Sequence, residues 1–149
     1  MPDLLSEEVR ATALAMTRVM FPHHDLPDEA YEKVVNQLEA DAHGDESVLP
    51  AIELGVSQLN DPRPFAELDA EEQLEVLKRA EAAESPFFGL VHATAVVELY
   101  DNPLVWKAFG YEGPSVHAGG YVHRGFDDLD WLPEPHLLSP QFAQKIQEA

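Results

Sequence analysis

Apolar residues recur every three or four positions through the first hundred residues, which is the spacing of one buried face of an α-helix. Clusters of proline, glycine and asparagine interrupt this recurrence, so it predicts five successive helices. The buried stripes expected in the first four helices are Val9, Ala13, Met16 and Met20; Ala30, Val34, Leu38 and Ala42, with Tyr31 and Val35 beside them; Leu49, Ile52, Val56 and Leu59; and Leu74, Leu77 and Ala80.

Short polar residues stand where four of these helices are expected to begin. Ser6, Ser47 and Ser85 are predicted N-caps, because a serine hydroxyl accepts a hydrogen bond from a backbone N–H of the first turn. Asp69, with Glu72 three residues later, resembles a capping box, in which each side chain bonds the backbone of the other residue.

The fifth predicted helix, at residues 87–97, is apolar nearly all round. A helix of this kind is typical of the centre of a bundle. Asp101, Asn102 and Pro103 are expected to end it, and residues 104–109 are long enough for one or two further turns.

The pattern changes at residue 110. Five of the eight glycines lie in residues 110–125, eight of the thirteen aromatic residues lie at or after Tyr100, and no helical or strand period runs through residues 110–135. Disordered segments are poor in aromatic residues, so we expect an ordered arm here.

The expected fold is therefore all-α. A helical bundle is expected at residues 1–109, followed by an irregular arm at residues 110–149 that ends in a short helix at residues 141–148. With 149 residues, the chain is expected to form one domain overall, its arm packed on the bundle or on a partner.

The charge of the chain is strongly one-sided, with 28 acidic residues against 9 basic ones and a formal net charge of -19. Nucleic acids and anionic membrane surfaces are polyanions, so this charge argues against both as partners. It favours solubility and a partner with a basic surface, although the acidic residues can equally serve only to solvate the outer helix faces. The sequence contains no cysteine, which excludes disulfides and thiolate metal sites.

No targeting or membrane segment is recognisable. The first residues lack a basic region, an apolar run and a twin-arginine pair. The longest apolar stretch, at residues 87–99, is interrupted by His92, Thr94 and Glu98 and is too short to span a bilayer. We therefore expect no membrane insertion, and a location that is cytoplasmic, or periplasmic by co-export with a partner.

Side chains that could carry chemistry are present but match no catalytic motif. His117 and His123 are followed by Asp127 and Asp128, a spacing unlike HExxH and related metal motifs. Ser115 lies near His117 but in no GxSxG elbow, and no GxGxxG sequence opens a helix. We expect no catalytic residue, metal or cofactor in this chain; a small His/Asp metal-dependent enzyme is the alternative.

The arm supplies the candidate binding residues. Aromatic side chains are enriched at the energetic centres of protein interfaces, and here they stand among glycines and prolines. Covering the bundle's own core is the alternative role for the same side chains. The predicted partner interface consists of Trp106, Phe109, Tyr111, Pro114, His117, Tyr121, His123, Phe126 and Trp131.

Residues 99–114, LYDNPLVWKAFGYEGP, carry a Pro-x-x-Trp segment followed by a Gly-Tyr-x-Gly-Pro turn. In this they resemble the gluconate 2-dehydrogenase subunit 3 family, in which a helix with paired aromatics leads into these two elements. Phe87 and Phe88 match the start of that helix, residues 68–72 resemble the family's capped fourth helix, and residues 21–25 match its loop after the first helix. The resemblance covers roughly residues 5–133.

The resemblance implies a non-catalytic small subunit that binds and stabilises a large flavin-dependent dehydrogenase of the glucose–methanol–choline class. The FAD would belong to that partner, and some complexes of this class add a cytochrome c subunit. Family members often carry a twin-arginine signal and escort the large subunit during export, a signal that the first residues here do not show. An acidic protein-binding or inhibitor module unrelated to redox chemistry is the alternative function.

Overall fold

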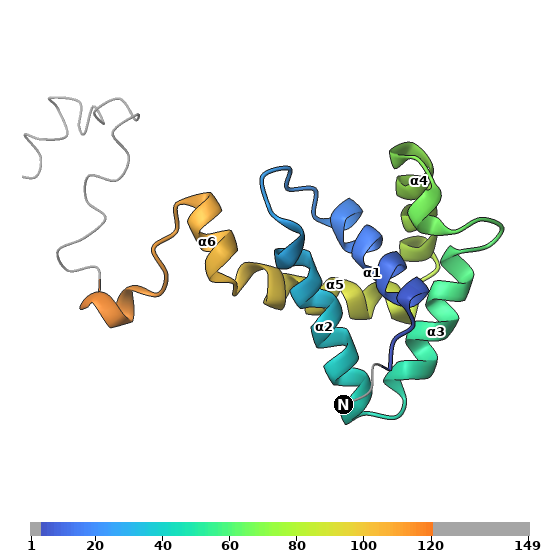
Figure 1. Cartoon of the computed structure of the whole chain (residues 1–149), viewed down its shortest axis with the longest axis horizontal. Helices are drawn as coiled ribbons and strands as arrows, with labels where there is room; N and C mark the ends of the chain where they lie inside the picture. Colours follow the sequence, from blue (N-terminus) through green and yellow to red (C-terminus); the bar gives the residue numbers. More distant parts are fainter. Residues whose placement is uncertain (1–3, 121–149) are drawn as a thin grey trace, which may run out of the picture. The chain divides into compact units, whose positions relative to one another are not determined.

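The computed structural model describes residues 4–120, and this part of the chain is helical without strands. The chain divides into two units, residues 1–113 and 114–149, and each is described by itself. The elements are α1 (Glu7–Met20), α2 (Asp28–Gly44), α3 (Val48–Leu59), η1 (Phe65–Glu67), α4 (Ala70–Ala82), α5 (Pro86–Tyr100), α6 (Pro103–Phe109) and η2 (Ser115–Ala118), where η denotes a 3-10 helix (Figure 1). The predicted all-α class is confirmed. The arm beyond residue 120 and the expected helix at 141–148 lie outside the described residues.

Helix α5 is the centre of the first unit, as its apolar sequence predicts. It packs against each of the five other α-helices of the described chain, and Figure 1 shows it crossing α2. Its inner face, formed by Phe87, Val91, Ala95 and Leu99, is buried. This face joins the two buried clusters of the unit, one around α1, α3 and η1 and the other around Tyr31 of α2.

The other face of α5 is exposed, so the helix is not buried all round. This outer face of α5 consists of Gly89, His92, Ala93, Val96, Val97 and Tyr100, and every one of these residues is solvent-exposed. Apolar side chains on both faces of a helix are expected to be covered. Within the described chain, only the inner face meets this expectation.

The predicted stripes of α1, α2 and α3 lie in the core, with Met20 and Leu49 half-buried at its margin. In α4 the prediction for Leu74 is wrong, because its side chain is 44% exposed. Leu77 and Ala80 face inward as predicted, and Gln73 and Val76 complete the inner row of α4. Gln73 takes the place expected for Leu74 because its amide donates a hydrogen bond of 3.0 Å to the carbonyl of Phe65.

The helix starts follow the predicted caps with one exception. Ser6 and Ser85 accept hydrogen bonds from the third backbone N–H beyond them, and the capping box of α4 is present. Ser47 is the exception: its side chain caps nothing and instead donates 2.7 Å to the carboxylate of Asp45. Asp45 therefore organises this turn by an Asx-type contact.

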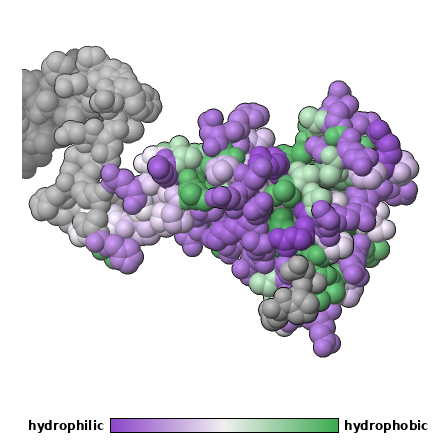
Figure 2. Space-filling view, in the orientation of Figure 1, coloured by the Kyte–Doolittle hydropathy of each residue, from purple (hydrophilic) through white to green (hydrophobic). Residues whose placement is uncertain are grey.

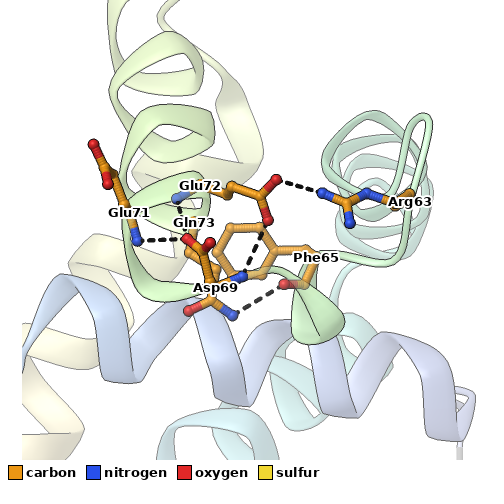
Figure 3. Close-up of polar contacts among 6 residues, drawn as sticks. All are labelled: Arg63, Phe65, Asp69, Glu71, Glu72 and Gln73. Atoms are coloured by element: carbon orange, nitrogen blue, oxygen red, sulfur yellow. Dashed lines mark hydrogen bonds and ion pairs between the residues drawn. The ribbon is translucent and has the colours of Figure 1, made fainter.

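The capping box of α4 extends into the preceding loop (Figure 3). Asp69 accepts from the backbone N–H of Glu72 at 2.9 Å, and Glu72 accepts from that of Asp69 at 3.2 Å. The second oxygen of Glu72 pairs with Arg63 at 2.5 Å. The acidic residues here therefore hold the loop to the helix.

Helices α3 and α5 approach closely at Gly55. A Cβ atom placed on Gly55 would lie 2.2 Å from the Cβ of Phe87, which is far inside van der Waals contact. Phe87 is itself buried, so only glycine permits this approach.

The described part of the second unit is a single 3-10 turn, η2. The N–H of Gly120 donates to the carbonyl of Ser115 at 2.8 Å, and Gly119 and Gly120 both have positive φ. The glycine pair therefore forms a tight turn, in a backbone conformation that glycine adopts without strain. No helix in residues 4–120 is long and apolar enough to cross a membrane.

Candidate protein-binding surface

Exposed apolar side chains are concentrated at one end of the first unit. Hydrophilic residues cover most of the face seen in Figure 2, as the charge of the chain requires. Of the nine large hydrophobic side chains that are exposed in the described chain, six lie within residues 96–111. These six are Val96, Val97, Tyr100, Leu104, Phe109 and Tyr111.

Five rings meet where α5 ends, and we call them the aromatic corner: Phe21, His23, His92, Tyr100 and Phe109. The His23 ring stands edge-on to Phe109 and Tyr100, with centroids 5.2 and 5.8 Å apart. Tyr100 stacks on Phe109 at 6.4 Å. Such offset and edge-to-face contacts stabilise aromatic pairs beyond the burial of their area.

Buried Tyr31 of α2 positions the loop side of this corner. Its hydroxyl donates 2.7 Å to the carbonyl of Phe21 and accepts from the N–H of His23 at 3.2 Å. The Arg18 guanidinium lies over the Tyr31 ring, 4.4 Å from its centroid. The loop after α1 is therefore fixed against the core rather than free.

A hydrogen bond joins the two sides of the corner. The Nε2 atom of His23 lies 2.8 Å from the hydroxyl of Tyr100, across 77 residues of sequence. Burial raises the pKa of Tyr100 above its ordinary 10.0, and the nearby Tyr31 adds to this. The raised pKa favours the neutral phenol, which can either donate to or accept from the His23 ring.

The Gly-Tyr-x-Gly-Pro turn wraps around Trp106. The indole N–H donates 2.6 Å to the carbonyl of Tyr100, and the Tyr111 ring stands edge-on to the indole at 5.5 Å. Gly110 and Gly113 have positive φ, and a Cβ on Gly113 would lie 3.3 Å from the Trp106 ring. Trp106 is half-buried while Tyr111 is exposed, so the tryptophan serves partly to shape the turn.

Lys33 of α2 ties the end of α5 to the bundle. Its ammonium group pairs with Glu98 at 3.0 Å and donates to the carbonyl of Asp101 at 3.0 Å. The charge of Glu98 is therefore engaged with α2, away from the apolar side chains on the outer face of α5. The surface is thus suited to exclude water on contact, which is the property of an interface centre.

The predicted interface residues fall into three sets. Phe109 enters the aromatic corner, and Trp106 pairs with Tyr111 in the same unit. Pro114 and His117 are exposed in the second unit. The other four predicted residues, Tyr121, His123, Phe126 and Trp131, lie outside the described residues.

The sequence did not assign Phe21, His23, His92 or Tyr100 to this surface. Phe21 and His23 follow a helix directly before and after a proline, which indicates only a break. Their contacts with α5 join residues far apart in the sequence, 77 positions for His23 and Tyr100, and a local hydrophobic period cannot predict such a contact. An aromatic residue that directly follows a helix is the one local signal that could have suggested a docked loop.

The described chain gives little geometry for other chemistry. Within residues 4–120, no three His, Asp or Glu side chains are grouped as ligands for a metal ion. A hollow of about 410 Å³ lies between the loop at Asp61 and helix α4. Its Arg63, Asp69 and Glu72 already pair with one another or with backbone groups, so they hold structure together.

Comparison of the chain with protein-family models, curated proteins and solved structures finds no match. The resemblance of residues 99–114 to the subunit 3 family therefore stays a prediction from the residues themselves.

Proposed function

We propose that the chain is a non-catalytic small subunit that binds and stabilises a large FAD-dependent sugar or alcohol dehydrogenase. The observation that carries the proposal is that, of the nine large hydrophobic side chains exposed in residues 4–120, six lie within residues 96–111. Solvent-exposed apolar clusters of this kind mark protein-binding surfaces. The same segment contains most of the block that resembles the subunit 3 family.

In this proposal the dehydrogenase holds the FAD and carries out the oxidation, while this chain contributes binding energy. A protein that binds only the folded state of its partner stabilises that state by mass action. The exposed rings of Phe109 and Tyr111 supply rigid apolar area at low entropic cost, which is why aromatic residues dominate interface energetics. A cytochrome c subunit enters as a third member of the complex only through the family resemblance.

The test is to identify the protein that co-purifies with this chain from its native source and, if it is a flavoprotein of this class, to express it with and without the chain. We expect the flavoprotein to co-purify with the chain and to lose yield, flavin content or activity without it. Phe109→Ala and Tyr111→Ala should weaken the complex, whereas Leu54→Ala on α3, which is 61% exposed, should not. A flavoprotein that is soluble, flavin-loaded and fully active alone would overturn the stabilising role.

An acidic binding or inhibitor module is the second candidate, favoured by the net charge of -19. It predicts a basic partner without flavin and an affinity that falls steeply with salt. Identification of the protein that co-purifies from the native source, with its absorbance spectrum for flavin, separates the two functions.

A further inference from the structure

The outer face of α5 is largely apolar and contains no Asp, Glu, Lys or Arg. Its exposed residues run from Gly89 to Tyr100, and His92 is the one basic side chain among them, in a chain that is 25% charged. Val97 is 57% exposed and Val96 is 43% exposed. This face ends at Tyr100, so it is continuous with the aromatic corner.

Comparison of two helix glycines indicates that nothing in residues 4–120 covers this face. Gly55 has an internal reason, since a Cβ would collide with Phe87. Gly89 has none: a Cβ there would meet nothing within 4 Å. Glycine destabilises a helix relative to alanine. A close neighbour from outside the chain would account for Gly89.

The spacing of the small side chains fits a helix as that neighbour. Gly89, Ala93 and Val97 are four residues apart and form one row along α5, bordered by the row of His92, Val96 and Tyr100. Helices pack by placing a row of side chains from one helix between two rows of the other. Gly89 and Ala93 have the smallest side chains on this face, so a neighbouring helix could approach the backbone of α5 closely along their row.

We propose that the outer face of α5 binds an apolar helix of the partner whose margins are basic, a proposal that rests on the proposed function. Exposed acids stand at both ends of α5, Glu84 before it and Asp101 after it. Lysine or arginine at the margins of the partner helix would face these acids. A second copy of this chain is disfavoured, because each copy carries a net charge of -19.

The first test measures the affinity of the full chain for the flavoprotein. Val97→Glu should raise Kd at least about tenfold, since it places a charge at the centre of the contact. Ala93→Leu should raise Kd by a similar factor by filling the low row, although leucine is apolar and favours helix. Leu54→Glu, on the exposed side of α3, is the matched control and should bind as wild type.

The second test measures thermal unfolding of the isolated full chain. Val97→Glu and Ala93→Leu should leave Tm within about 2 °C of wild type, and Gly89→Ala should not lower it. Gly89→Ala should nevertheless raise Kd by about threefold or more, so stability and affinity would move in opposite directions. A clear loss of Tm in Val97→Glu would show that the face is covered within the chain and would overturn the proposal.

The third test concerns the partner's charge. Raising NaCl from about 50 to about 500 mM should weaken the complex, and Glu84→Gln with Asp101→Asn should reduce this salt dependence. An unchanged dependence would refute the basic margins. Concentration-dependent dimerisation of the chain that Val97→Glu abolishes would make the occupant a second copy instead.

These outcomes separate the two proposals. If wild type does not bind the flavoprotein, the proposed function fails. If wild type binds and the α5 variants bind equally well, the function stands and this inference fails.

Discussion

The two faces of α5 are both apolar, but one is packed inside the bundle and the other is exposed to water. On the inner face, Phe87 fills the space above Gly55, and every apolar side chain has neighbours within the chain. On the outer face, Val96 and Val97 are equally apolar and remain in contact with water. The apolar composition of α5 correctly predicts that this helix lies at the centre of the bundle. Only the packing shows which of its apolar residues stabilise the fold and which stay exposed and available to a partner.

The largest expected effect contrasts two phenylalanines. Phe87→Ala should cost about 3–5 kcal/mol of unfolding free energy, because it empties a buried site on the inner face. Phe109→Ala should cost below about 1 kcal/mol, because its ring is 54% exposed. Urea unfolding of the isolated chain measures both values. Equal losses would show that Phe109 belongs to the core and would remove it from the binding surface.

A smaller effect is expected at the close approach of α3 and α5. Gly55→Ala should cost about 1–3 kcal/mol, since the new methyl group overlaps the Cβ of Phe87. Gly44→Ala, where a Cβ would meet nothing within 4 Å, is the control and should change stability little. In a double-mutant cycle, Gly55→Ala combined with Phe87→Ala should cost less than the sum of the two. Additive losses of unfolding free energy would show that the steric contact between residues 55 and 87 does not contribute to the cost.

The inner contacts also include an ionic one, at Glu39 of α2. Its carboxylate accepts from the N–H of Leu4 at 2.7 Å and of Leu5 at 3.1 Å, and it pairs with Arg10 at 2.7 Å. Glu39→Gln should cost about 1–2 kcal/mol near neutral pH, since charge-assisted hydrogen bonds are lost. Glu75→Gln, in an exposed pair with Lys78, is the control and should leave Tm unchanged.

The stabilisation that Glu39 gives to the fold should decrease in acid, where its carboxylate becomes protonated. The Leu5 N–H bond is the main cause that holds the pKa of Glu39 below its ordinary 4.5, with the Leu4 N–H and Arg10 acting in the same direction. A depressed folded pKa gives stability that is complete above the unfolded pKa and is lost as pH falls through the folded one. The difference between wild type and Glu39→Gln should therefore shrink below pH 4.5. A difference that grew in acid would contradict this network.

The sequence predicts the buried helix faces well, because a helix that buries one face has apolar residues at every third or fourth position. The stripes of α1 and α2 and the capping box at Asp69 are visible in short windows. The prediction fails at Leu74 because Gln73, a polar residue, occupies the inner row by bonding a backbone carbonyl. The spacing of apolar residues cannot predict that hydrogen bond.

The candidate surface is predictable only in part, for the same physical reason. Phe109 and Tyr111 stand in a block whose composition indicates exposed aromatics, and both are exposed. His23 meets Tyr100 across 77 residues, a contact set by the packing of α2 against α5. The exposed face of α5 escapes prediction because an apolar helix looks the same in sequence whether one face or both are covered.

The smallest expected effect tests whether the aromatic corner is preformed for a partner. Tyr100→Phe keeps the ring but removes the hydroxyl that contacts His23 Nε2 at 2.8 Å, so the isolated chain should lose below about 1 kcal/mol. Burial raises the pKa of Tyr100 above 10.0, so wild type should lose stability relative to Tyr100→Phe as pH rises past that value, where the unfolded phenol ionises first. Kd for the flavoprotein should rise a few-fold, because the corner loses the bond that joins its two sides. Tyr111→Phe removes a hydroxyl from the same surface outside this contact and serves as the control for both measurements. An unchanged Kd for Tyr100→Phe, with the loss at high pH present, would assign the corner to folding and leave the outer face of α5 as the remaining docking surface.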